Sequence, residues 1–321
     1  MTFAKPSERK MSASSILFCL LILFLLALFI KNPQVASEAV KGALKTCGHM
    51  LLPSLFPLTV MSEIAMESGS VEGFIRPISK IAAKIFGLKK EAATPLVLGL
   101  VCGYTASLNG ALSLYRDGKI TKSECEKIIS LASLPSLSFF SGVAGTVVLG
   151  SARDGFLLWA IAVFSALALG FLTRKSAPKS DKAQSQEAKF RTPQPLAKTI
   201  VGAISHSAYS MLLVCACVIF FCSLISVLRF ALDGIGVPEV AQEIILGSLE
   251  ISNGVLSCTK IPSHALRGAA CGGAIGWSGF SVHFQIISLC DGKELSFKKY
   301  FFLKILQGLL CALISFFVLQ K

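Results

Sequence analysis

The stretch Leu98–Gly110, which reads LGLVCGYTASLNG, decides how this chain folds. It is apolar enough for a membrane, yet it places Gly103, hydroxyl side chains and an amide side chain in its middle. Non-helical backbone at membrane depth is tolerated only where protein or water, and not lipid, surrounds it. The stretch therefore permits a re-entrant hairpin, a segment that enters and leaves the membrane on the same side.

The composition of the whole chain predicts an all-α polytopic membrane protein. Of its 321 residues, 53% are hydrophobic and 15% are charged, whereas a soluble domain carries about 25% charged residues. The apolar runs are continuous rather than alternating, which favours membrane helices over a membrane β-barrel. The first run, 14–30, follows Lys5, Arg9 and Lys10. A cleaved signal peptide is the alternative for it, but the run is at the upper length limit for one, so an uncleaved span is favoured.

Apolar segments follow one another along the chain, separated by short polar connectors. Their approximate bounds are 14–30, 46–66, 94–115, 126–150, 155–173, 200–230, 240–258, 264–290 and 298–320. In the connector before 126–150, Thr121–Glu124 reads TKSE and predicts a capping box that begins a new helix.

The distribution of basic residues predicts the topology. Those before the first span place the N-terminus in the cytoplasm, and the connectors 73–90, 116–127 and 174–198 are basic as well. If 94–115 and 126–150 both crossed the membrane, the linker 174–198 would lie outside. The conflict disappears if 94–115 is re-entrant. With 240–258 treated in the same way, the chain has seven spans, two hairpins and an outside C-terminus.

The connector 73–90 predicts an amphipathic helix in the membrane interface. Ile78 and Ile81 recur at helical spacing, while Lys80 and Lys84 occupy other faces. The net charge of +13 is gathered in such connectors, so the expected neighbours are membrane lipids with anionic head groups at the cytoplasmic face. No module that binds nucleic acid is recognisable.

The two halves of the chain repeat one plan in opposite orientation. In each half a long span precedes a short glycine-interrupted segment, a longer interrupted segment and a final span. Inverted repeats with interrupted helices at matching positions indicate a transporter-like bundle. The predicted division is an N-terminal span and connector (1–45), a first repeat (46–173), a basic cytoplasmic linker (174–198) and a second, inverted repeat (199–321).

Motifs of soluble enzymes and metal sites are missing from the sequence. There is no G-x-S-x-G, P-loop or H-E-x-x-H motif, and the eleven cysteines form no C-x-x-C pair. Cysteines inside apolar runs are expected to be reduced and packed between helices. We expect no enzyme activity, no metal and no cofactor.

The four interruptions supply the candidate residues for a substrate site near the middle of the membrane. They carry hydrogen-bonding side chains with little net charge, which suits a small polar solute that is neutral or zwitterionic, or one coupled to protons. The candidates are Tyr104, Thr105, Asn109, Ser136, Glu250, Ser252, Asn253, Ser281, His283 and Gln285.

Glu250 is the sharpest of these candidates. A charge at membrane depth costs about 2.5–3.5 kcal/mol on insertion scales, so an ionisable residue there suggests function. The alternatives are that Glu250 pairs with Lys260 or Arg267 and only joins helices, or that the hairpin tip reaches water. His283 is either a proton relay or a packed, hydrogen-bonded residue.

Several motifs resemble a known family. LLPSLFPLTVMSEI (51–64), the stretch 99–133, LEISNG (249–254) and WSGFSVHFQ (277–285) resemble the sporulation integral membrane proteins of the YlbJ type. That family is part of the wider group with nucleoside-recognition Gate domains. The resemblance implies a multi-pass protein of the forespore or mother-cell membrane that is needed for endospore formation at the cortex stage. It implies no particular substrate.

Two functions remain open at this point. The first is a transporter or gate for a small polar solute, bound between the two repeats. The alternative is a non-transporting membrane scaffold, which recruits partners in sporulation through the linker 174–198 and the helix at 74–90.

Overall fold

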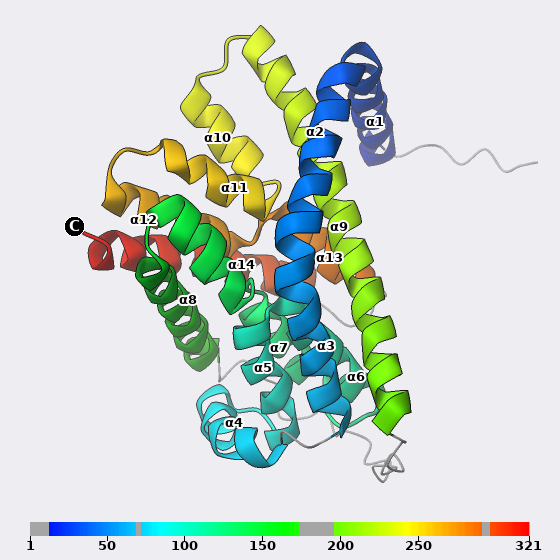
Figure 1. Cartoon of the computed structure of the whole chain (residues 1–321), viewed down its shortest axis with the longest axis vertical. Coiled ribbons are helices and arrows are strands. Elements are labelled where there is room, and N and C mark those ends of the chain that lie inside the picture. Colours follow the sequence, from blue (N-terminus) through cyan, green and yellow to red (C-terminus); the bar gives the residue numbers. More distant parts are fainter. Residues whose placement is uncertain (1–12, 69–71, 174–195, 291–295, 321) are drawn as a thin grey trace, which may run out of the picture.

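The chain is all helical in the part that its computed structural model describes, residues 13–68, 72–173, 196–290 and 296–320 (Figure 1). Most of the predicted linker 174–198 lies outside the described residues. The helices before the linker are α1 (Ala13–Lys31), α2 (Pro33–Thr46), η1 (Cys47–Leu51), α3 (Leu52–Ser68), α4 (Glu72–Phe86), α5 (Lys90–Cys102), α6 (Tyr104–Arg116), α7 (Lys122–Ala132), η2 (Phe139–Leu149) and α8 (Ala152–Leu172). Those after it are α9 (Leu196–Gly234), α10 (Glu239–Gly247), α11 (Ile251–Ser257), η4 (Cys258–Lys260), α12 (His264–Trp277), α13 (Gly279–Leu289) and α14 (Phe297–Val318).

Four of the described helices are long and apolar enough to cross a membrane: α1, α8, α9 and α14. This confirms a polytopic helical membrane protein. The expected span 46–66 corresponds to η1 and α3, which continue from α2 with helical backbone at both junctions. The other two expected spans are divided into shorter helices, α7 with η2 and α12 with α13.

The predicted capping box at the start of α7 is present. The hydroxyl of Thr121 accepts from the backbone N–H of Glu124 at 3.2 Å, and the Glu124 carboxylate accepts from the N–H of Thr121 at 2.9 Å. The second oxygen of the same carboxylate accepts from the N–H of Lys89 at 2.8 Å. One side chain therefore fixes both the start of α7 and the entry to α5.

The main hydrophobic core joins the two halves of the chain. Buried side chains of α5, α7, η2 and α8 pack with those of α11, α12, α13 and α14 in one cluster. A second cluster lies between η1 and α9, around Leu51 and Val214. In contrast, α1 has no buried residue, although its side chains are strongly apolar. Such a helix is suited to contact with lipid.

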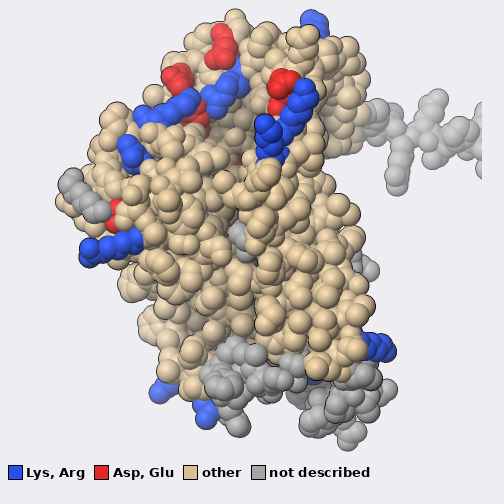
Figure 2. Space-filling view, in the orientation of Figure 1, with Lys and Arg blue, Asp and Glu red and all other residues tan. Residues whose placement is uncertain are grey.

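The amphipathic helix predicted at 74–90 is α4, and it has three distinct faces. Phe86 is buried in the main core, while Ile78 and Ile81 are exposed apolar side chains and Lys80 and Lys84 are exposed charges. A helix that meets protein, an apolar phase and water at once is suited to the membrane interface. In Figure 2 basic side chains alone are visible at the end of the molecule where α4 lies, whereas acidic and basic side chains mix at the end where α2 and α10 lie.

Candidate functional site

Each of the four predicted interruptions is present, and three of them contain a residue with positive φ or a proline. Between α5 and α6, Gly103 has φ +103, and between α12 and α13, Ser278 and Gly279 have φ +76 and +78. Ser278 is the sole non-glycine residue with positive φ in the described chain. Residues 133–138, around Pro135, separate α7 from η2, and residues 248–250 separate α10 from α11.

The interruptions satisfy one another's backbone groups in pairs. The N–H of Tyr104, at the first, donates to the carbonyl of Leu134, at the second, at 2.8 Å. In the other half, the N–H of Phe280 donates to Ser248 at 3.0 Å and that of Ser281 to Leu249 at 2.8 Å. Broken helices at membrane depth need such partners, because no lipid can supply them.

A further contact joins the two halves at the same place. The hydroxyl of Ser278 donates to the carbonyl of Ser133 at 2.8 Å, and the ammonium of Lys304 donates to that carbonyl at 2.8 Å. Lys304 also donates to the Gln307 amide oxygen at 2.7 Å and is fully buried. All four interruptions therefore meet at one point in the core.

A cavity lies at this meeting point, and we call it the central cavity. Its apolar wall includes Leu51, Leu55, Val214 and Val218 of η1, α3 and α9. Its polar lining is Tyr104, Thr105, Ser133, Ser136, Glu250, Ser252, Ser278, Ser281 and Gln285. The space open to the centre of a water molecule is about 40 Å³, which is room for a few waters, since one water needs about 10–15 Å³ on this measure.

Glu250 begins α11 as its N-cap and is fully buried. Its Oε2 accepts from the backbone N–H of Asn253 at 2.8 Å and from the Asn253 amide at 3.3 Å. Its Oε1 has no hydrogen-bond partner in the described protein. The Ser281 hydroxyl, another part of the cavity lining, has none either. Buried polar atoms of this kind cost about 1–3 kcal/mol each when unsatisfied, so the cavity is chemically suited to a polar guest.

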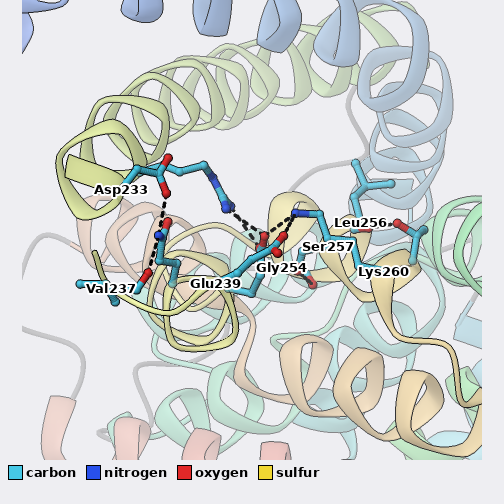
Figure 3. A network of polar contacts seen from close by, with 11 residues as sticks. Asp233, Val237, Glu239, Gly254, Leu256, Ser257 and Lys260 are labelled. Atoms are coloured by element: carbon cyan, nitrogen blue, oxygen red, sulfur yellow. Dashed lines mark hydrogen bonds and ion pairs between the residues drawn. The ribbon is translucent and has the colours of Figure 1, made fainter. Parts of the chain in front are cut away.

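The basic residues considered as partners of Glu250 bond elsewhere. Lys260 contacts the carboxylates of Glu239 at 2.8 Å and Glu243 at 2.7 Å, and Figure 3 shows it reaching toward Glu239. These bonds, that to Glu239 first, raise the pKa of the exposed Lys260 ammonium above its usual value. Arg267 donates to backbone carbonyls, among them that of Ile261 at 2.8 Å. The interpretation of Glu250 as half of an ion pair with either residue is therefore wrong.

The same ion-pair network joins the helix pair α10–α11 to the C-terminal end of α9. The guanidinium of Arg229 donates to both oxygens of Glu243, at 2.9 and 3.1 Å. Close by, the Gln242 amide donates to Asp233 at 2.7 Å (Figure 3). The charged side chains of α10 therefore bond to α9 and η4, while Glu250, at the N-cap of α11, lines the central cavity.

Seven of the ten candidate residues line the central cavity, and three do not. Asn109 lies elsewhere and donates to Glu63 at 2.8 Å and to Ser210 at 3.2 Å. His283 is fully buried among aromatic rings, with its Nδ1 2.7 Å from the Tyr300 hydroxyl. Asn253 lines a neighbouring cavity described below. Of the seven, Tyr104 and Gln285 are joined by a hydrogen bond across the two halves.

Lys304 and Gln307 are buried polar residues at the junction of the interruptions that were not predicted from the sequence. The segment 298–320 was expected to be a plain span, yet both side chains are buried at the junction of the interruptions. The rule that pointed to Glu250 also applies to a lysine within an apolar helix. As for metals, no group of three or more potential ligands occurs among the residues that the structure describes.

Comparison with known proteins gives one informative similarity. The chain is 24% identical over 338 positions to the sporulation integral membrane protein YlbJ of Bacillus subtilis (strain 168), and the match covers 93% of this chain and 81% of that protein. No protein-family model and no solved structure matches the chain. The similarity extends over nearly the whole length, and it confirms the resemblance to YlbJ-type proteins seen in the motifs.

Proposed function

We propose that this chain is a transporter or gate for a small polar solute in a membrane of the developing endospore, needed at the cortex stage. The observation that carries the proposal is the central cavity. All four helix interruptions meet there, and it is lined by a buried carboxylate, Glu250, whose Oε1 has no partner in the described protein. The similarity to YlbJ supports the part in sporulation.

Mirrored contacts support two inverted Gate-like repeats, 46–173 and 199–321. In both halves the interruption of a helical hairpin is bonded to that of the following helix pair. The two tryptophans of the chain make the same kind of contact, although from non-equivalent helices, α8 and α12. Trp159 donates its indole N–H to the carbonyl of Leu100 at 2.8 Å, and Trp277 donates to that of Ser248 at 3.0 Å. Each acceptor lies at the end of the first helix of a hairpin or directly after it.

The proposed orientation follows from the charges. We place the end with α4 and the start of α9 in the cytoplasm, where its exposed lysines meet anionic head groups. The hairpins α5–α6 and α10–α11 then enter from opposite sides as re-entrant segments, and α1 to α14 make seven spans. This is the arrangement in which two repeats rock around a fixed site.

The lining favours a neutral polar or zwitterionic solute. It has hydroxyl groups, one side-chain amide and one carboxylate, and no basic side chain. Because the cavity holds only a few waters in this conformation, a larger solute requires the hairpins to move apart. The observed conformation is thus an occluded one, in which the interruptions are closed on each other.

The direct test is the substitution Glu250→Gln in the full-length protein, with Glu239→Gln as the matched control. The control carboxylate is exposed and lies in the same hairpin. Each variant is produced in a Bacillus subtilis strain that lacks the YlbJ relative, and heat-resistant spores are counted. We expect the wild-type chain and the control to restore sporulation and Glu250→Gln to fail at an equal level in the membrane. Full sporulation with Glu250→Gln, together with unchanged uptake in proteoliposomes, would remove Glu250 from the mechanism.

The scaffold alternative makes the opposite prediction for the linker. Deleting 174–198 and joining the halves with a neutral sequence of equal length should leave a transporter largely active. A scaffold that acts through this linker would lose sporulation, while Glu250→Gln would not affect it.

A further inference from the structure

A second cavity lies between α2, α9 and α11, and we call it the vestibule. It is lined by small side chains of α2, including Gly42 and Ala43, by Cys222 of α9, and by Asn253 of α11. The space open to the centre of a water molecule is about 240 Å³, several times that of the central cavity. Gly42 leaves room there, because a Cβ built on it would have no neighbouring atom within 4 Å.

The vestibule and the central cavity share a wall. Val218 and Ser252 line both cavities. A chain of hydrogen bonds also runs through this wall, since the Asn253 amide donates to the Cys222 sulfur at 3.1 Å and to Oε2 of Glu250 at 3.3 Å. The residues that separate the two spaces therefore include the N-terminal turn of α11, and Glu250 lines the central cavity at the start of this turn.

The mouth of the vestibule is suited to water rather than lipid. α2 carries Glu38, Lys41 and Lys45 beside its small residues, and Glu38 and Lys41 form an exposed ion pair at 2.7 Å. Charges are costly in hydrocarbon, so this part of α2 belongs at the level of head groups or water. Figure 2 shows acidic and basic side chains at this end of the molecule.

We propose that the vestibule is the route by which water and a neutral polar solute reach the central cavity, and that the wall of Val218 and Ser252 is the gate between them. The route deepens the proposed function and rests on it for the identity of the solute. Access of water-soluble molecules to the cavity can be tested without any transport.

Native cysteines report on both sides of this wall. Cys222 lines the vestibule and Cys102 lines the central cavity. Cys19, exposed on the apolar helix α1, serves as a lipid-facing reference, and Cys271 is fully buried. The full-length protein in nanodiscs is treated with 2-aminoethyl methanethiosulfonate, a small charged thiol reagent, and each cysteine is followed by peptide mass spectrometry. We expect Cys222 to react fastest, Cys102 more slowly, and Cys19 only with a lipid-soluble maleimide.

Two substitutions then test whether a water-soluble reagent passes through the vestibule before it reaches the central cavity. Gly42→Leu fills the vestibule and should slow the reaction of Cys222 and Cys102 about tenfold. Gly48→Leu is the matched control, because a Cβ there also has no neighbour within 4 Å and the residue does not line the vestibule. Val218→Ala thins the wall and should speed the reaction of Cys102 several-fold while that of Cys222 stays within about twofold.

The possible outcomes distinguish a failure of the proposed route from a failure of the proposed function. Reaction of Cys222 with the lipid-soluble reagent alone, or reaction of Cys102 that Gly42→Leu does not slow, overturns the proposed route whatever the protein transports. If both cysteines respond as expected, but deletion of 174–198 abolishes sporulation and Glu250→Gln does not affect it, the route stands and the proposed function fails.

Discussion

Glu250 forms no ion pair with Lys260 or Arg267, so its charge and its hydrogen bonds should affect the free energy of unfolding in opposite directions. Substitution by Gln and by Ala separates the two effects. In Glu250→Gln the new amide oxygen can keep the 2.8 Å bond from the N–H of Asn253, while the NH₂ group takes the place of Oε1 toward the cavity. The change removes the burial of a charge, which is worth up to about 3 kcal/mol. Glu250→Ala removes the N-cap of α11 as well, and it leaves a buried N–H unpaired, at a cost of about 1–3 kcal/mol.

The expected order of stability is therefore Gln equal to or above wild type, and Ala below wild type by about 1–3 kcal/mol. The measurement is the apparent unfolding midpoint of each full-length variant in nanodiscs of one lipid composition, with Glu239→Gln as an exposed control. A Gln variant that is destabilised as much as the Ala variant would refute the reasoning. It would mean that a cation compensates the charge of Glu250, although Lys260 and Arg267 bond to other groups in the structure.

Two further predictions concern the backbone of the interruptions. Ser278→Ala should lower the free energy of unfolding by about 1 kcal/mol, because it loses the bond to the Ser133 carbonyl; Ser278→Gly should stay closer to wild type, since glycine tolerates φ +76 without strain. The unfolding midpoint in nanodiscs measures both, and an Ala variant as stable as wild type would contradict the role of this bond. Gly254→Ala should cost about 1–3 kcal/mol, because its Cβ would lie 2.4 Å from the carbonyl oxygen of Gly247. Its control is Gly142→Ala, where a Cβ has no neighbour within 4 Å, and equal midpoints for these two variants would exclude a tight contact between α10 and α11.

Local chemistry explains why the sequence alone predicted much of the helical framework. The capping box at Thr121 needs only residues three apart, and three of the four interruptions contain a glycine with positive φ or a proline. Gly103 and the interruption that carries Ser136 were therefore correctly predicted as places where the helices end. Lys304 could have been predicted by the same argument that selected Glu250, since both are ionisable residues in apolar sequence. Its segment was predicted to be an uninterrupted span, and Gly308, the glycine near it, lies within the continuous helix α14.

The sequence by itself determined the class of protein, the first span, the helix interruptions and the polar residues that accompany them, because these depend on composition and on neighbours in the chain. Only the tertiary structure decided which polar groups meet. Asn109 lies with Glu63, and His283 with Tyr300, away from the central cavity. Glu250 has no cation, although Lys260 and Arg267 follow it closely in sequence. The physical reason is that each of these bonds joins two different helices, and the relative position of the helices is set by packing of the whole core.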